Sequence, residues 1–377
     1  MMEETIKKYI DAFKVRHYNI IRNKDIKTND PSLLFLNSSM AIFKDDMSKG
    51  KYIKKTVCVQ DCLRNNNELT SLKYFRMLGI IASSAYLDEA GKILFDFLFN
   101  DVGIDKKYLY CVAHKDDLVF RDFWCRYGNK DNFILTDEND EQYSTRWTYG
   151  KNFEITGKGL TLVYNNPLIE KCSDKCTIYC GCKKYVQFGN IIIANHNDVG
   201  YLDFGLGLER LLSCRYLNDI YKIPEIKEYI RVCVDNKYSL QDSYAIYNLI
   251  HSIHKILSSG IRYGNKKEGY VLKSITRQIT DIISDYVGSY GEVVICDRIF
   301  DLYHRYNVIY HEADDSYVKC VIDEVKKYIK NLNRNLVMAY RVIDEDDSSN
   351  IEEKAAILHD RYGLPYKLVE KILFDDH

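Results

Sequence analysis

The pattern of hydrophobic and polar positions divides the chain into a mixed part followed by a helical part. Ile6, Ile10 and Phe13 recur at helical spacing near the start, with lysines on the opposite side, which predicts an amphipathic helix. Residues 32–210 alternate short apolar runs with turn-rich stretches. The runs SLLFLN, KKTVCVQ, LTLVYNN and NIIIANHN have the length and composition of strands, so we expect a sheet with interspersed helices.

Beyond about residue 225 the apolar positions follow helical spacing. Two long segments show it, with Leu272, Ile275, Ile279, Ile282 and Tyr286 in the first and Val318, Val321, Ile322, Val325 and Ile329 in the second. After the acidic stretch DEDDSSNIEEK, Gly363 and Pro365 are expected to separate two final short helices. The predicted class is α+β, with a sheet-containing domain over 1–225 and an all-helical domain over 226–377.

Composition and net charge exclude few classes of protein. The chain of 377 residues is 46% hydrophobic and 28% charged, and its net charge of −1 announces no partner, although a local basic face for nucleic acid is compatible with it. No apolar run is long enough to span a membrane, and the start lacks the apolar stretch of a signal peptide. We therefore expect a cytoplasmic protein whose 12 cysteines are reduced thiols or metal ligands.

The stretch YLDFGLGLERLLS, residues 201–213, combines features that suit a ligand. Gly205 and Gly207 remove side chains from alternate positions of an expected strand, which lets a flat group lie against the backbone. Asp203 precedes them, and Arg210 follows at the start of an expected helix. Two glycines alone are more typical of a tightly packed strand crossing than of a ligand site, so the interpretation depends on the charged residues beside them.

Together these residues resemble motif 3 of class II aminoacyl-tRNA synthetases, and LDFGLGLERL resembles the form found in the alanyl-tRNA synthetase family. Further similarities follow in the same order along nearly the whole chain. They comprise NDPSLLFLNSSMAIFKDDM, then VQDCLRNNN with KYFRMLG as motif 2, Trp147, YVQFGNIIIANHN, GIRYGNKKEGYVLKSITRQ and ILHDRYGLPYKLVE. The chain stops where the family's editing domain would begin, so the resemblance is to a truncated form without that domain.

The resemblance implies a catalytic domain built on an antiparallel sheet, followed by a helical tRNA-recognition domain. It implies ATP and Mg²⁺, a small amino acid, and the acceptor stem of alanine tRNA as ligands, with no membrane or DNA partner. By position, Arg64 would contact the α-phosphate and the substrate carboxylate, and Arg210 the adenine and the γ-phosphate. Asp203 would accept the substrate ammonium, while Asn190 and Trp147 would line the amino-acid pocket beside Gly205 and Gly207. Trp147 is equally typical of a core residue.

The resemblance also assigns residues to RNA recognition. Asn265 and Asp360 match the residues that read the G·U wobble pair of the acceptor stem, and an amide and a carboxylate suit that task. Asn265 lies within a run of positive charge that includes Arg262 before it and Lys266, Lys267, Lys273 and Arg277 after it. Lys266, Lys273 and Arg277 would contact phosphates. A charge run of this kind is also typical of a solvated helix face.

Three departures from the family leave the function open. Arg76 stands where the family has a glutamate near the nucleotide, residues 151–163 replace a glycine- and cysteine-containing loop, and Gly189 replaces a tryptophan. The interpretation is an enzyme that activates alanine and transfers it to alanine tRNA. The alternatives are a paralogue that activates another small acid, for a biosynthetic pathway, and a non-catalytic tRNA-binding protein.

Four cysteines cluster at Cys172, Cys176, Cys180 and Cys182. Four thiolates can complete a tetrahedral zinc site without other ligands. The irregular spacing, without a CxxC pair, is compatible with free thiols as well. A catalytic role is disfavoured because no histidine lies nearby in the sequence to activate a thiol.

Overall fold

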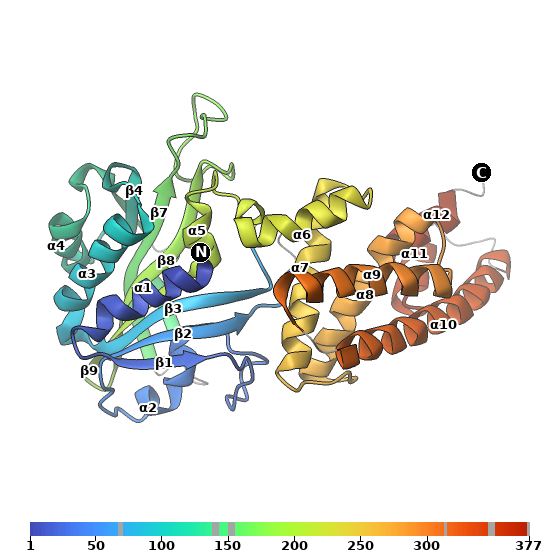
Figure 1. Cartoon of the computed structure of the whole chain (residues 1–377), viewed down its shortest axis with the longest axis horizontal. Helices are drawn as coiled ribbons and strands as arrows, with labels where there is room; N and C mark the ends of the chain where they lie inside the picture. Colours follow the sequence, from blue (N-terminus) through green and yellow to red (C-terminus); the bar gives the residue numbers. More distant parts are fainter. Residues whose placement is uncertain (67–70, 138–142, 150–154, 313–314, 346–350, 375–377) are drawn as a thin grey trace. The chain divides into compact units, whose positions relative to one another are not determined.

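A computed structural model describes residues 1–66, 71–137, 143–149, 155–312, 315–345 and 351–374. The chain forms two compact units, residues 1–228 and 229–377 (Figure 1). The predicted boundary at residue 225 and the boundary between these units both fall within one helix, α6 (Pro224–Asp235). What each unit does remains a prediction at this point.

The first unit is built on a mixed sheet. Its strands are β1 (Asn19–Asn23), β2 (Thr56–Leu63), β3 (Tyr74–Ser83), β4 (Leu109–His114), β5 (Phe133–Thr136), β6 (Arg146–Tyr149), β7 (Ile155–Asn165), β8 (Tyr185–His196) and β9 (Val199–Gly207). They lie in the order β1-β2-β3-β9-β8-β7-β4-β5, with β6 also paired to β7. All pairs are antiparallel except β1 with β2 and β4 with β5. An α+β fold with a largely antiparallel sheet is therefore confirmed.

The two faces of this sheet are covered differently. The helices of the unit are α1 (Met2–Lys14), α2 (Lys44–Ser48), α3 (Leu87–Asp96), α4 (Leu118–Tyr127) and α5 (Leu208–Ser213). Helix α1 packs against β1, β2 and α5 on one face. On the other face, Met40 and Met47 from the segment around α2 pack on Ile81, Ala194 and Tyr201. This second face, which also carries Gly205 and Gly207, is called the open face because the pocket described below opens on it.

The second unit is helical. It contains α7 (Leu240–Ser258), α8 (Lys267–Val287), α9 (Glu292–Tyr310), α10 (Asp315–Glu345), α11 (Ile351–Asp360) and α12 (Tyr366–Phe374). Helix α10 packs on both α8 and α9. Tyr328 and Leu332 of α10 also form a core cluster with Leu358 of α11 and Leu364, which precedes α12. Among the described residues, no helix combines the length and the apolar content needed to cross a bilayer.

Most predicted elements are confirmed, and one is wrong. The predicted amphipathic N-terminal helix is α1, with Ile6 and Phe13 buried. The predicted runs KKTVCVQ, LTLVYNN and NIIIANHN overlap β2, β7 and β8. Gly363 and Pro365 lie between α11 and α12. Residues 32–37 contain no strand. There Asp30 accepts hydrogen bonds from both the backbone N–H and the hydroxyl of Ser32 and pairs with Lys44, so local side-chain bonds replace a ladder.

Candidate active site and nucleic-acid interface

The strand register places the predicted pocket residues on one face of the sheet. Asn190 lies opposite Gly205, and Asp203 lies opposite Ile192. Across the next pairs, Trp147 lies opposite Gly157 and Gly157 opposite Ala194, two residues from Ile192. Directly opposed residues point to the same side of an antiparallel pair, as do residues two apart on one strand. Residues predicted from distant parts of the sequence therefore share the open face.

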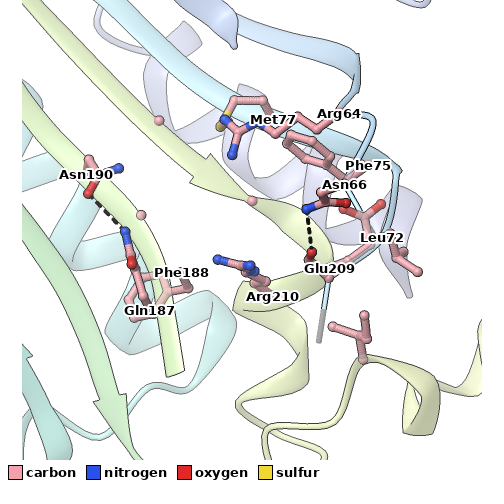
Figure 2. Close-up of a pocket in the computed structure, with 15 residues that line it drawn as sticks. Arg64, Asn66, Leu72, Phe75, Met77, Gln187, Phe188, Asn190, Glu209 and Arg210 are labelled. Carbon is pink, nitrogen blue, oxygen red and sulfur yellow. Dashed lines mark hydrogen bonds between the residues drawn. The ribbon is translucent and has the colours of Figure 1, made fainter. Parts of the chain in front are cut away.

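The open face contains a pocket of about 650 Å³ (Figure 2). Arg64, Asn190, Gly205, Gly207 and Arg210 all line it. Both glycines present bare backbone, and a Cβ added to Gly205 would lie 3.3 Å from Sδ of Met77. The pocket therefore has two cations at its border and an unobstructed strand as its floor.

Arg64 and Arg210 reach the pocket from different elements. Arg64 follows β2, and its Nε and Nη2 donate to the carbonyl of Asn37 at 3.2 and 2.9 Å. Its guanidinium lies over the ring of Phe75 at 5.0 Å. Arg210 comes from α5, which begins directly after β9. The two guanidiniums are thus placed by a turn after one strand and by a helix after another, an arrangement that suits an extended polyphosphate.

Asp203 lies deeper on the open face, between the cluster around Tyr201 and the pocket glycines. It is 5% exposed, and its Oδ1 is buried without a hydrogen-bond partner. Burial raises the pKa of this carboxyl from its ordinary value to about 7. The side chain of Ser39 lies over Gly79, whose neighbour across the strands is Gly205. The buried Oδ1 of Asp203, an acceptor without a partner, indicates a place for a donor from a ligand.

Asn190 and Trp147 differ in how they relate to the pocket. The Oδ1 of Asn190 accepts from the Thr161 hydroxyl at 2.8 Å. It also accepts from Nε2 of Gln187 at 3.5 Å (Figure 2). Trp147 is half-buried on β6 and is not among the described residues that line the pocket. Its pocket role, predicted from the resemblance, therefore remains a prediction.

The departures from the family find structural explanations at two of the three positions. Gly189 lines the pocket, and a Cβ added to it would lie 2.9 Å from Cγ of Leu206, so this glycine also permits close packing of β8 on β9. Within 151–163, residues 155–163 belong to strand β7, and 151–154 lie outside the described residues.

Arg76 belongs to the side of the sheet away from the pocket, between Phe75 and Met77, which both line the pocket. Its backbone N–H and Nε donate to the two carboxylate oxygens of Glu209 at 3.0 and 3.1 Å. Its Nη1 lies 3.3 Å from Oε1 of Glu3 on α1. Glu209, 6% exposed, directly precedes Arg210. The positive charge of Arg76 is therefore neutralised by two carboxylates, and the Arg76 side chain links β3 to α5 and α1.

The four clustered cysteines converge in space. Their Sγ atoms all lie within 4.8 Å of one another, and the Cys172–Cys180 and Cys176–Cys182 separations are 3.2 and 3.7 Å. Zinc–sulfur bonds of about 2.3 Å at tetrahedral angles place sulfurs about 3.8 Å apart. The segment is closed at its base, where the N–H of Asn166 donates to the carbonyl of Lys184 at 2.9 Å. The donor set and its spacing fit a zinc ion.

In the helical unit the predicted RNA-contacting residues are only partly available to a ligand. Asn265, Lys266 and Asp360 are exposed. Lys273 donates from Nζ to Oδ1 of Asn265 at 2.8 Å and lies 3.6 Å from the buried carboxylate of Glu324. Arg277 is half-buried, with its guanidinium over the Tyr328 ring at 5.3 Å. Lys273 and Arg277 thus have contacts within the unit.

Several pocket residues were missed by reasoning from the sequence. Phe75, Met77, Gln187 and Glu209 all line the pocket in addition to the predicted residues. Phe75 and Met77 alternate within KYFRMLG, so a strand period of two would have placed both on one face. For Gln187 we find no comparable signal, because its position depends on the irregular register between β7 and β8.

Comparison with known proteins agrees with this geometry. The family described as "tRNA synthetases class II (A)" matches residues 4–377, and the chain belongs to this family. Within it, the curated relatives include the alanine–tRNA ligases of Borreliella afzelii (strain PKo), 27% identical over 99% of this chain and 69% of the relative, and of Lawsonia intracellularis (strain PHE/MN1-00), 23% identical over 98% and 46%. The chain spans about half the length of the Lawsonia and Elusimicrobium minutum relatives.

Among solved structures, apo histidyl-tRNA synthetase of S. aureus is similar at 11% identity. The match covers 57% of this chain and 69% of that chain, with a TM-score of 0.35.

Proposed function

We propose that the protein activates a small amino acid, alanine, with ATP and transfers it to alanine tRNA. The observation that carries this proposal is the open face itself, where two arginines border a bare strand and a buried carboxylate, one of whose oxygens has no hydrogen-bond partner, lies behind them. The names of the relatives support the choice of alanine.

The first step, activation of the amino acid, depends more on the positioning of the two substrates than on proton transfer. The carboxylate of the amino acid attacks the α-phosphorus of ATP, and the bond from that phosphorus to pyrophosphate breaks. Arg64 would neutralise charge at the α-phosphate, and Arg210 would hold the distal end of the nucleotide. Asp203 would accept the substrate ammonium, which requires the ionised carboxylate. Because Asp203 lies two residues from Gly205 on one strand face, the amino acid would lie beside the pocket glycines.

Mg²⁺ would supply charge neutralisation at the phosphates. Glu209 is the single carboxylate among the described residues that line the pocket, and both its oxygens already accept from Arg76. A Mg²⁺ ion commonly keeps several waters and binds substrate phosphates with one or two carboxylates. The pocket therefore fits Mg²⁺ held mainly by ATP, because its one carboxylate among the described lining residues is already paired with Arg76.

Zinc would have a structural role in this protein. Bound by Cys172, Cys176, Cys180 and Cys182, it would fix the segment before β8, the strand that carries Asn190. The site is distinct from the reacting groups, and no step of the reaction passes through it.

For tRNA, the contact between Lys273 and Asn265 gives the two proposed base-pair readers, Asn265 and Asp360, different hydrogen-bonding roles. A lysine has only donors, so Asn265 must turn its carbonyl oxygen to Lys273 and its NH₂ group outward. Asn265 would then donate to an acceptor in the minor groove, and the carboxylate of Asp360 would accept from the guanine amino group. Lys273 would act as a positioning residue for Asn265, and Lys266 would contact phosphate.

The test of activation is amino-acid-dependent exchange of pyrophosphate into ATP, measured with a panel of small amino acids. We expect alanine to be preferred, and Arg64→Ala and Arg210→Ala to lower the rate by roughly two orders of magnitude or more. Arg126→Ala, at an exposed position outside the pocket, is the control. A faster reaction with another small acid would support the paralogue, and ATP binding without exchange would support a non-catalytic tRNA-binding protein.

The test of tRNA choice compares charging of alanine tRNA with that of the same tRNA carrying G·C in place of the wobble pair. Asn265→Ala or Asp360→Ala should reduce the discrimination by about 1–3 kcal/mol each. Lys273→Met should resemble Asn265→Ala, with little change in the salt dependence of binding. A loss of affinity for all RNAs would instead make Lys273 a phosphate contact.

A further inference from the structure

The middle of helix α10 carries a run of positive charge without acidic residues. Within residues 325–341 there are five lysines and arginines, Lys326, Lys327, Lys330, Arg334 and Arg341, and no aspartate or glutamate. All five are exposed, and none forms an ion pair with another described residue. The whole helix, Asp315–Glu345, holds six lysines and arginines against five aspartates and glutamates, so its positive charge is concentrated in residues 325–341.

These five side chains lie on one side of the helix. At about 100° per residue they fall within an arc of about 100°, and at about 1.5 Å per residue they extend over about 22 Å. The opposite side is occupied, because Tyr328, Leu332 and Ala339 are buried in the core cluster with α11 and α12. We call the five residues the α10 ridge.

The helix is connected to both proposed base-pair readers. Glu324 contacts Lys273, which holds Asn265, and Nδ2 of Asn335 donates to the carbonyl of Tyr362 at 2.8 Å, two residues after Asp360. Glu324 and Asn335 are 11 residues apart, which is about three helical turns, so they lie along one edge of α10. A duplex bound by the two readers is thereby brought alongside this helix.

We propose that the α10 ridge binds the phosphate backbone of an RNA duplex, independently of its sequence. The inference rests on the proposed tRNA substrate and extends its contact surface beyond the two readers. Unpaired cations in a row suit a strand of phosphates, which contributes affinity and salt dependence without selecting bases. An anionic membrane is disfavoured as the partner, because the apolar stripe that would enter a membrane is already packed in the core.

The experiment measures binding of the full chain to alanine tRNA and to an unrelated RNA duplex across a range of salt concentrations. The ridge variant is Lys326→Gln, Lys330→Gln and Arg334→Gln combined. The matched control combines Arg231→Gln, Lys237→Gln and Arg298→Gln, three exposed cations of the same unit that form no ion pair with described residues. Glutamine keeps the helix propensity close to that of lysine and arginine.

We expect the ridge variant to bind both RNAs roughly tenfold or more weakly and to flatten the slope of log K against log salt by about two, with the control unchanged. The same discrimination between the wobble pair and G·C should remain. Equal binding by ridge and control variants would overturn the proposal, as would tighter ridge-dependent binding to phosphatidylserine vesicles than to RNA. Pyrophosphate exchange, which needs no tRNA, reports separately on the proposed activation step.

Discussion

Burial of Asp203 without a ligand lowers the free energy of unfolding, and the size of this loss can be measured from its dependence on pH. The pKa of this carboxyl is raised by burial from 3.8 to about 7. The folded protein therefore keeps a proton that the unfolded chain releases above about pH 4, and the free energy of unfolding falls as pH rises from about 4 to 7. Three pKa units at about 1.36 kcal/mol each give a cost of about 4 kcal/mol at pH 8.

The perturbation is Asp203→Asn, which removes the charge and keeps the shape. A buried amide without partners costs about 1–3 kcal/mol, so the net gain at pH 8 is smaller than the full electrostatic cost. That amide cost does not vary with pH. The stability of Asp203→Asn relative to the parent should therefore increase by about 3 kcal/mol between pH 5 and pH 8.

The assay is denaturant unfolding of both proteins at pH 5 and pH 8 without ligands. Asp219→Asn is the matched control, because Asp219 is also 5% exposed but accepts from Lys183 Nζ at 3.0 Å and from the N–H of Tyr221 at 3.1 Å. Asp219→Asn should destabilise the protein at both pH values. If the difference between Asp203→Asn and the parent stays constant with pH, the reasoning is refuted.

The same substitution should greatly reduce amino-acid activation. In the parent, the KM for the amino acid should rise as pH falls below about 7, because the protonated carboxyl cannot pair with the ammonium.

Two further predictions concern charge and metal. Arg76→Glu would place a third carboxylate beside Glu209 and Glu3 and should cost about 3–5 kcal/mol in unfolding experiments, because it leaves the buried Glu209 without its partner. Arg126→Glu, which breaks an exposed pair with Asp88, should cost about 1 kcal/mol or less, and similar losses for both variants would contradict the buried link. Elemental analysis of protein purified without chelators should find one zinc per chain, lost on Cys176→Ser with Cys182→Ser but kept on Cys125→Ser. Zinc absent from the parent would remove the metal site.

The sequence predicted many of the elements and several residues of the candidate site, because both depend on local signals. Helical spacing predicted α1, α8 and α10, and short apolar runs predicted β2, β7 and β8. Gly205, Gly207 and Arg210 are close together in the sequence. Because β9 runs directly into α5, all three lie at the same pocket.

What only the tertiary structure decided was which distant residues meet, since pairing across strands and helices leaves no local trace. The register across β3, β9, β8 and β7 brought Arg64, Asn190 and Arg210 to one pocket and buried Asp203 behind it. Arg76 contrasts most with the expectation from sequence. There the departure from the family suggested a disturbed nucleotide site, whereas the strand period turns its side chain away from the pocket and onto Glu209. Lys273 likewise belongs to a charge run in the sequence, but packing of α8 on α10 gives it Asn265 and Glu324 as partners.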